Sequence, residues 1–324
     1  MKELKELIKH KLKKNKVIFS KLQFLAGDAS NRKYFRLFQK NTSKVVMYDN
    51  LGSKSIENFV NKSSLFFESG IRVPAIYQSF PDDGILLMEY FGNSKFSKIL
   101  NNSNEYKLYK LATDTLISLH KKNRKEELEF YSKKKFIDEV NLFFDWFLPL
   151  YSKSVSTKKK KEFIKEFKKL LDIPMKLPRV TIHRDFHVDN IFYLKKKINI
   201  SQCGWIDYQD ALFGTCVYDL MSLLEDARRD ISKNLKGKII KYYIEHFPKI
   251  DEKLFIYSFK IIAVQRHLKV LGIFSRLFVK DKKNEYLNHI PRVIRLLKLN
   301  LKFEKLKSLS EFISPLIKNK ESYD

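Results

Sequence analysis

The order of structural patterns along the first 92 residues restricts the fold of this chain more than any other feature. Alternating apolar residues predict strands at 24–26, 34–38 and 44–48, an amphipathic helix at 55–69, and two further strands at 76–80 and 85–90. Gly, Asp, Asn and Pro residues form turn sequences between neighbouring strands. This order predicts a five-stranded sheet that carries a single helix.

The chain from residue 93 onward has mainly helical periodicity. Helices are expected at 104–121, 134–150, 158–171, 217–230, 234–247, 252–279 and 284–305. Short β-type runs between residues 178 and 210 interrupt this pattern. We therefore predict an α+β fold with a strand-rich lobe at 1–92 and a larger, mainly helical lobe at 93–324.

The composition excludes several classes of protein. Hydrophobic residues make up 44% of the 324 residues, enough for a sizeable core, and only two residues are Cys, which excludes a disulfide scaffold. No apolar run reaches the ~18 residues of a membrane span, and the Lys-rich start lacks the apolar segment of a signal peptide. We expect a cytoplasmic monomer with no membrane partner.

The net charge of +27 raises the question of an anionic partner. Only 12 of the 64 basic residues are Arg, the residue that reads bases and phosphates best, and the lysines are spread through most of the chain. We interpret them as a solvated surface and expect no specific nucleic-acid partner.

The sharpest chemical signal is the segment HRDFHVDN at 183–190, followed by GWID at 204–207. Asp185 and Asn190 lie five residues apart in a loop between two short apolar runs, and Asp207 ends another. Phosphoryl transfer uses one carboxylate to orient the attacking hydroxyl, with an amide oxygen and a second carboxylate to hold Mg²⁺. The alternative, that both Asp residues only cap turns, does not explain why all three features agree.

These residues carry a family resemblance. HRDFHVDNIF and GWIDYQDALFGTCVYDL resemble the motifs of the aminoglycoside phosphotransferase/choline kinase superfamily, which has a bilobal protein-kinase-like fold. The resemblance implies a nucleotide-binding first lobe, a catalytic and substrate-binding second lobe, and ATP with Mg²⁺ as cofactors. It makes Asp185 the catalytic base and makes Asn190 and Asp207 the metal ligands, and it implies that Asp219 braces the catalytic loop.

Four further segments narrow the resemblance. GDASNRKYFRL at 27–37, GIRVPAIY at 70–77, the run at 206–229 and QRHLKVLGIFSRL at 265–277 resemble bacterial kinases that phosphorylate the anomeric hydroxyl of N-acetylmuramate and N-acetylglucosamine in cell-wall recycling. The implied substrate is a small sugar. Two alternatives stay open: a kinase of another small hydroxyl compound, aminoglycoside- or choline-like, and a non-catalytic nucleotide- or RNA-binding module.

The resemblance also implies the residues that bind the nucleotide. The turn formed by Gly27, Asp28, Ala29, Ser30 and Asn31 takes the place of the phosphate loop, although it has one Gly, and backbone atoms of Glu89 and Tyr90 are expected to face adenine. Within the predicted third strand, residues 45–48 lack the Lys with which kinases pair the phosphates, and Lys44 lies only at the mouth of the strand. Arg32 or Arg36 in the neighbouring hairpin is expected to supply that cation.

The predicted acceptor side draws on three segments. Its residues are Gln209, Asp210, Arg228, Arg229, Gln265 and His267. Arg228 and Arg229 are expected to end the helix that begins near Asp219, where one of them would meet the lactyl carboxylate of N-acetylmuramate; the alternative is a favourable place at the negative helix end. Gln265 and His267 are equally consistent with satisfied polar groups of the core.

Overall fold

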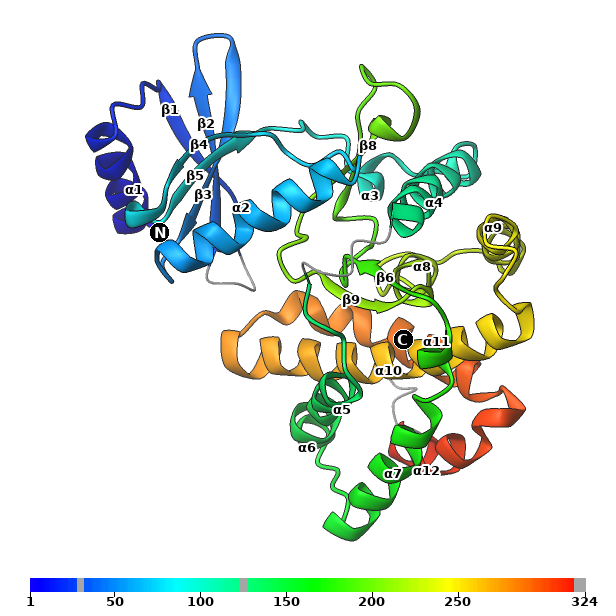
Figure 1. Ribbon diagram of the computed structural model, residues 1–324. Coiled ribbons are helices and arrows are strands. Elements are labelled where there is room, and N and C mark those ends of the chain that lie inside the picture. The colour runs from blue at the N-terminus through cyan, green and yellow to red at the C-terminus, as the bar shows by residue number, and fades with distance from the viewer. Residues whose placement is uncertain (28–31, 123–127, 318–324) are drawn as a thin grey trace. The chain divides into compact units, whose positions relative to one another are not determined.

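The computed structural model describes residues 1–27, 32–122 and 128–317 (Figure 1). The chain separates into two compact units, Met1–Leu100 with Asp189–Gln209 and Asn101–Val188 with Asp210–Asp324. The division predicted after residue 92 therefore differs from this one by eight residues and by the segment 189–209, which joins the first unit.

The first unit contains the predicted sheet. Its elements are α1 (Lys2–Lys14), β1 (Lys21–Ala26), β2 (Arg32–Gln39), β3 (Thr42–Asp49), α2 (Ser53–Glu68), β4 (Ile76–Phe80), β5 (Ile85–Glu89) and α3 (Phe96–Ile99). The five strands pair antiparallel in the order β1-β2-β3-β5-β4. The predicted order of three strands, one helix and two strands is confirmed, whereas α1 was not predicted.

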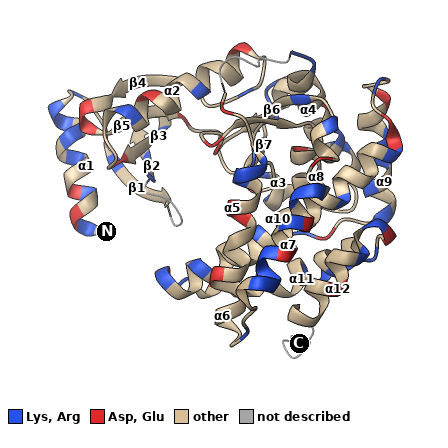
Figure 2. Ribbon diagram, turned by 60° about the horizontal axis from the view of Figure 1, so that its bottom comes forward, with Lys and Arg blue, Asp and Glu red and all other residues tan. Residues whose placement is uncertain are grey.

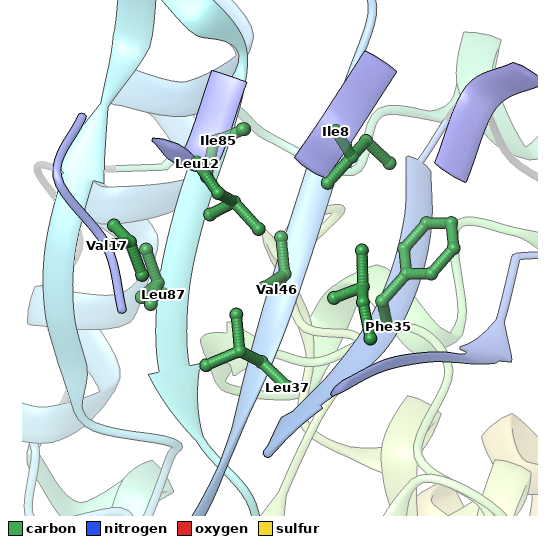
Figure 3. Close-up of a cluster of buried hydrophobic side chains, with 9 residues drawn as sticks. Ile8, Leu12, Val17, Phe35, Leu37, Val46, Ile85 and Leu87 are labelled. Atoms are coloured by element: carbon green, nitrogen blue, oxygen red, sulfur yellow. The ribbon is translucent and has the colours of Figure 1, made fainter. Parts of the chain in front are cut away.

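A hydrophobic cluster joins α1 to one face of the sheet (Figure 3). The cluster consists of Ile8, Leu12, Val17, Leu22, Phe35, Leu37, Val46, Ile85 and Leu87. Because side chains alternate across a strand, Arg32, Tyr34 and Arg36 lie on the opposite face of β2 from Phe35 and Leu37. Arg32 and Arg36, the two cations predicted to pair with the nucleotide phosphates, therefore lie on the face of the sheet away from α1.

A hairpin from later in the chain completes the first unit. It consists of β7 (Ile191–Tyr193) and β8 (Cys203–Trp205), which pair antiparallel. Residues of this segment pack on α2: the ring of Tyr208 lies 5.4 Å from that of Phe59 and 5.3 Å from that of Phe66, and Trp205 lies 5.9 Å from Phe66. These aromatic contacts fix the residues around Asp207 against the helix.

The second unit is mainly helical. Its elements are α4 (Glu105–Lys122), α5 (Lys133–Leu142), a π-helical turn (Phe143–Phe147), α6 (Leu148–Leu150), α7 (Thr157–Leu170), β6 (Arg179–Ile182), β9 (Leu212–Thr215), α8 (Val217–Leu224), α9 (Lys233–Glu245), α10 (Glu252–Asp281), α11 (Ile290–Leu301) and α12 (Lys307–Ile317). The 30-residue α10 contacts α5, the π turn, α8 and α11, and so runs through the centre of this unit. In the same unit β6 and β9 pair antiparallel.

Two predicted helices are longer than those in the structure. The helix expected at 284–305 is α-helical only over Ile290–Leu301 and begins with a 3₁₀ turn at Asn284–His289. The helix expected at 217–230 ends at Leu224, and Arg228 and Arg229 follow it in a turn. Buried Asp226 explains the early end, because its carboxylate accepts a hydrogen bond from the backbone N–H of Arg228 at 2.9 Å and so favours a turn over a further helical turn.

Basic residues are distributed over the molecule. Figure 2 shows Lys and Arg on α1, α4, α7 and α9 alike, which agrees with the interpretation of a solvated surface. Among the residues that the structure describes, no helix combines the length and the apolar character that a bilayer crossing requires.

Candidate active site

The loop that carries Asp185 follows β6 and is held by a buried carboxylate. Asp219 on α8 accepts the backbone N–H of His183 at 2.6 Å and that of Arg184 at 3.0 Å. Arg184 has a positive φ of 75°, a conformation that costs a non-Gly residue energy unless its surroundings impose it. Asp219 therefore braces the loop, as the resemblance implied. His183 contributes through its ring Nδ1, which accepts the N–H of Asp185 at 3.3 Å.

The Asp185 carboxylate lies among cations of the second unit. Burial alone would raise its pKa, but the charges of Lys269, Arg266 and Arg184 together hold that pKa well below the usual range. An Nη atom of Arg266 lies 3.5 Å from a carboxylate oxygen of Asp185, whose side chain keeps 40% of its surface exposed. This arrangement keeps Asp185 ionised and accessible at neutral pH.

Glu139 on α5 links the cations beneath the loop. One of its carboxylate oxygens lies 2.6 Å from Arg184 and 2.9 Å from Lys269, and the other accepts from Gln265 at 2.9 Å. Arg266 in turn donates to the backbone carbonyl of Arg184 at 2.9 Å. Backbone and side chain of Arg184 are thus both fixed from α5, α8 and α10. Such a shared network holds a loop more firmly than separate pairs would.

Asn190 and Asp207 lie together in the first unit. Asn190 directly precedes β7, and Asp207 lies two residues after the end of β8. Because these strands pair antiparallel, both residues lie at the same end of the hairpin, where the N–H of Ile206 donates to the carbonyl of Asn190 at 3.0 Å. The amide nitrogen of Asn190 lies 3.3 Å from one carboxylate oxygen of Asp207, and Gln209 donates to the other at 2.9 Å. An amide and a carboxylate side by side offer oxygen ligands of the kind that Mg²⁺ prefers, and Mg²⁺ takes few protein ligands and completes its shell with phosphates and water.

The comparisons with known proteins agree with this geometry. A model described as the phosphotransferase enzyme family matches residues 21–252, more than half of the chain. The chain belongs to the phosphotransferase enzyme family. The resemblance inferred from the motifs is thereby confirmed.

Named relatives and solved structures show which members of the family this chain resembles. An N-acetylmuramate/N-acetylglucosamine kinase of Neisseria meningitidis is 30% identical over 314 residues, which covers 93% of this chain and 92% of the relative. A protein of the same name from Pseudomonas aeruginosa is 29% identical and covers 92% of this chain and 89% of its own. The structure of the choline kinase LicA from Streptococcus pneumoniae superposes with a TM-score of 0.66 at 14% identity, covering 91% of this chain and 99% of that one. The structure of an ADP-bound aminoglycoside phosphotransferase superposes with a TM-score of 0.59 at 17% sequence identity. This match covers 90% of this chain and 96% of that one. The kinase-like α+β fold is therefore confirmed.

The residues predicted to bind nucleotide lie in the first unit of this phosphotransferase. Asp28, Ala29, Ser30 and Asn31 fall outside the described residues. Gly27 precedes them with a φ of 146°, and its carbonyl accepts a hydrogen bond from the ammonium group of Lys33.

The residues predicted to face adenine lie at the other end of the sheet. The Glu89 side chain pairs with Arg72, and the backbone N–H of Glu89 donates to the carbonyl of Ala75 at 2.8 Å. That N–H is thus engaged within the protein. The ring of Tyr90 lies 4.4 Å below the guanidinium group of Arg36. The adenine contacts stay predictions.

The residues predicted for the acceptor side divide between the two units. Gln209 belongs to the first unit, and Asp210 to the second, where its carbonyl accepts from Arg184 at 3.2 Å. Arg228 lies 3.5 Å from Asp226, whose carboxylate also accepts the N–H of Val188 at the end of the catalytic loop, at 3.3 Å.

Arg229 lies 3.6 Å from Glu105 at the start of α4. Both ion pairs are long, and Arg228 and Arg229 keep 28% and 26% of their side-chain surface exposed. A ligand carboxylate can therefore compete for either guanidinium group, and the predicted anion contact remains a prediction.

Gln265 and His267 lie in the interior of the second unit. Both are at most 2% exposed. Besides Glu139, Gln265 donates to the backbone carbonyl of Phe136 at 3.2 Å. An oxygen of buried Glu225 lies 2.7 Å from the ring of His267, and Lys236 pairs with the other at 2.8 Å. These partners favour the interpretation of His267 as a satisfied core group. Gln265 is satisfied only through its amide nitrogen, because its buried Oε1 has no hydrogen-bond partner among the described residues. Contact of either residue with a substrate stays a prediction.

Sequence reasoning missed Glu139, Arg266 and Lys269. Arg266 and Lys269 are three residues apart on a long, largely buried helix and therefore share a face. Two cations on one face of a helix in the centre of a unit require buried acidic partners, and this was the signal available in the sequence.

Proposed function

We propose that this protein is an ATP-dependent kinase of a small sugar, which phosphorylates the anomeric hydroxyl of N-acetylmuramate or N-acetylglucosamine in cell-wall recycling in the cytoplasm. The observation that carries the proposal is the similarity to kinases of that name across nine-tenths of both chains. The phosphotransferase family match and the ionised Asp185 support the same chemistry.

The proposed reaction transfers the γ-phosphoryl group of ATP to the sugar. The sugar oxygen forms a bond to the γ-phosphorus, the bond from that phosphorus to the bridging oxygen breaks, and ADP leaves with the electron pair. The hydroxyl proton passes to the carboxylate of Asp185. Because the pKa of Asp185 is held low, the carboxylate first orients the hydroxyl and accepts the proton late, as expected for a loose transition state.

Asn190 and Asp207 are proposed to hold Mg²⁺ through their side-chain oxygens. Mg²⁺, when bound, neutralises the phosphate charge that grows as the bond to ADP breaks. Gln209 donates to Asp207 at 2.9 Å and keeps the carboxylate oriented. The positive φ of Asp207, 65°, indicates that the hairpin holds this residue in a fixed and costly conformation, a feature frequent at functional sites.

An acceptor panel tests the proposal. MgATP is supplied with N-acetylmuramate, N-acetylglucosamine, choline or an aminoglycoside, ADP release is followed, and phosphorus NMR identifies the phosphorylated position. Turnover with either sugar and a phosphate on the anomeric oxygen is the expected result. Turnover only with choline or the aminoglycoside would contradict the substrate, and nucleotide binding without turnover would favour a non-catalytic module.

A further inference from the structure

Arg32, the first residue of β2, takes part in a built ionic site in the first unit. Its Cα pairs with that of Asp49 across β2 and β3. Its Nε donates to the Asp49 carboxylate at 2.9 Å, and an Nη donates to the hydroxyl of Ser55 at 3.1 Å. Ser55 itself donates to Asp49 at 2.7 Å. The Asp49 side chain is fully buried, whereas Arg32 keeps 15% of its surface exposed.

This cluster links the same elements as the usual kinase ion pair, with different residues. In kinases a Lys on the third strand pairs with a Glu on the following helix and contacts the nucleotide phosphates. Here β3 supplies the carboxylate of Asp49, α2 supplies the hydroxyl of Ser55, and the cation comes from β2. Strand β3 does contain Lys44, but its ammonium group lies 5.0 Å from the ring of Tyr77 and its Cα pairs with that of Glu89, at the other end of the strand from Asp49.

The other candidate cation has a different environment. Arg36 lies four residues further along the same face of β2 and donates to the hydroxyl of Ser43 at 3.1 Å. Its guanidinium group lies 4.5 Å from the ring of Phe38 and 4.4 Å from the ring of Tyr90. It therefore lies toward the end of the sheet where β5 leads into Tyr90. Arg32 instead directly follows residues 28–31, the segment expected to serve as the phosphate loop.

Arg32 also lies on the same side of the unit as the proposed metal ligands. Its guanidinium group is 5.6 Å from the ring of Phe59, which in turn lies 5.4 Å from the ring of Tyr208, the neighbour of Asp207. Tyr34 reports the same proximity: burial raises the pKa of its phenol, the charge of Asp207 raises it further, and Arg32 lowers it. One buried phenol thus lies within electrostatic range of both groups.

We infer that Arg32, oriented by Asp49 and Ser55, is the cation that pairs with the nucleotide phosphates in place of the third-strand Lys. The inference rests on the proposed function, since it presupposes a bound nucleotide. A planar guanidinium group has five N–H donors and can contact a phosphate while an acidic partner fixes its plane, which an ammonium group does less well.

The test compares ligands with and without phosphates. Binding of MgADP and of adenosine is measured by calorimetry for the parent, Arg32→Gln, Arg36→Gln and Lys44→Gln. We expect Arg32→Gln to weaken MgADP by about 10- to 100-fold, the range for a lost hydrogen bond to a charged group, and to leave adenosine unchanged. Lys44→Gln removes the same charge from the same sheet and is expected to bind MgADP like the parent.

Arg32→Lys separates the effect of the charge at position 32 from that of the guanidinium geometry, and its partial recovery shows that the loss in Arg32→Gln is not a folding defect. Arg32→Lys keeps the cation but loses the fork, so it is expected to recover part of the MgADP affinity lost in Arg32→Gln. Parent-like MgADP binding by Arg32→Gln, equal losses of MgADP and adenosine, or a loss in Arg36→Gln instead would each overturn the inference. A parent that binds MgADP but phosphorylates no sugar contradicts only the proposed function, and a parent that binds no nucleotide overturns both.

Discussion

The same substitution, Gly to Ala, is expected to have opposite effects at two positions in the second unit. Gly272 in α10 faces the end of α5, and a Cβ added there would lie 2.3 Å from the carbonyl carbon of Leu142, 2.5 Å from its oxygen and 2.6 Å from its Cβ. Gly237 in α9 has no neighbour within 4 Å of an added Cβ. The pair therefore separates helix propensity from packing.

The magnitudes follow from the two environments. Ala is better than Gly inside a helix by about 1 kcal/mol, so Gly237→Ala is expected to raise the free energy of unfolding by up to that amount. At Gly272 the same gain is opposed by overpacking, which typically costs about 1–3 kcal/mol. Here the backbone of Leu142 must move by about 1 Å to reach ordinary contact, so the upper end of that range applies. We expect Gly272→Ala to lose about 2 kcal/mol, a difference of about 3 kcal/mol between the variants.

Urea unfolding followed by circular dichroism measures the free energy of unfolding of the parent, Gly237→Ala and Gly272→Ala. The comparison is valid if the slope of that free energy against urea concentration is equal in all three proteins. Turnover provides a second readout, because α10 also carries Arg266 and Lys269 beneath the catalytic loop. Gly272→Ala is expected to lower turnover and Gly237→Ala to leave it unchanged. If Gly272→Ala proves as stable as the parent, the close approach of α10 to residue 142 is not the reason for Gly at this position.

Four further outcomes are expected. Asp185→Asn should lower turnover by about 10²–10⁴-fold, the usual contribution of a positioned proton acceptor, with MgATP affinity retained in titrations; near-parental turnover would remove Asp185 from the mechanism. Asp207→Ala should abolish Mg²⁺-dependent nucleotide binding, and Asn190→Ala should weaken it less, since an amide is a neutral ligand; two variants that bind MgATP like the parent would exclude this metal site. Glu225→Gln tests the effect of a charged Glu225 on stability. Burial would raise the pKa of Glu225, but the hydrogen bonds and charges of His267 and Lys236 lower it from 4.5 to about 2. The substitution should cost about 3 kcal/mol in urea unfolding at pH 7, and the gap to the parent should close as the pH falls from about 4.5 toward 2, because a lowered pKa stabilises the fold only above it; a gap that is constant with pH would show that the charge does not matter. Arg228→Ala should weaken N-acetylmuramate by about 1.5–3 kcal/mol and N-acetylglucosamine, which has no carboxylate, far less; equal losses on both sugars would make Arg228 structural.

The elements that could be predicted are those whose pattern is local. The five strands and α2 followed from alternation and from turn residues. The spacing of Asp185, Asn190 and Asp207 predicted phosphoryl-transfer chemistry, and the roles of these three residues stay predictions. Helix α1 was missed because its lysines obscure a stripe of only two buried residues, Ile8 and Leu12.

The remainder depends on contacts distant in sequence. The end of α8 at Leu224 depends on Asp226, whose carboxylate bonds the backbone of Val188 as well as that of Arg228. The burial of His267 depends on Glu225, 42 residues earlier. Such pairings leave no periodic signal, so the sequence alone could not separate a core histidine from one that contacts substrate.

The first unit is assembled from two stretches of chain that the ribosome makes at different times. Residues 1–100 emerge first, but the aromatic side chains that cover Phe59 and Phe66 of α2 come from Trp205 and Tyr208. Until 189–209 has been synthesised, one face of this helix has no native partner from that segment. Folding of the N-terminal sheet is therefore completed only after more than half of the polypeptide has been translated, and a chain interrupted before residue 189 exposes apolar surface that chaperones recognise.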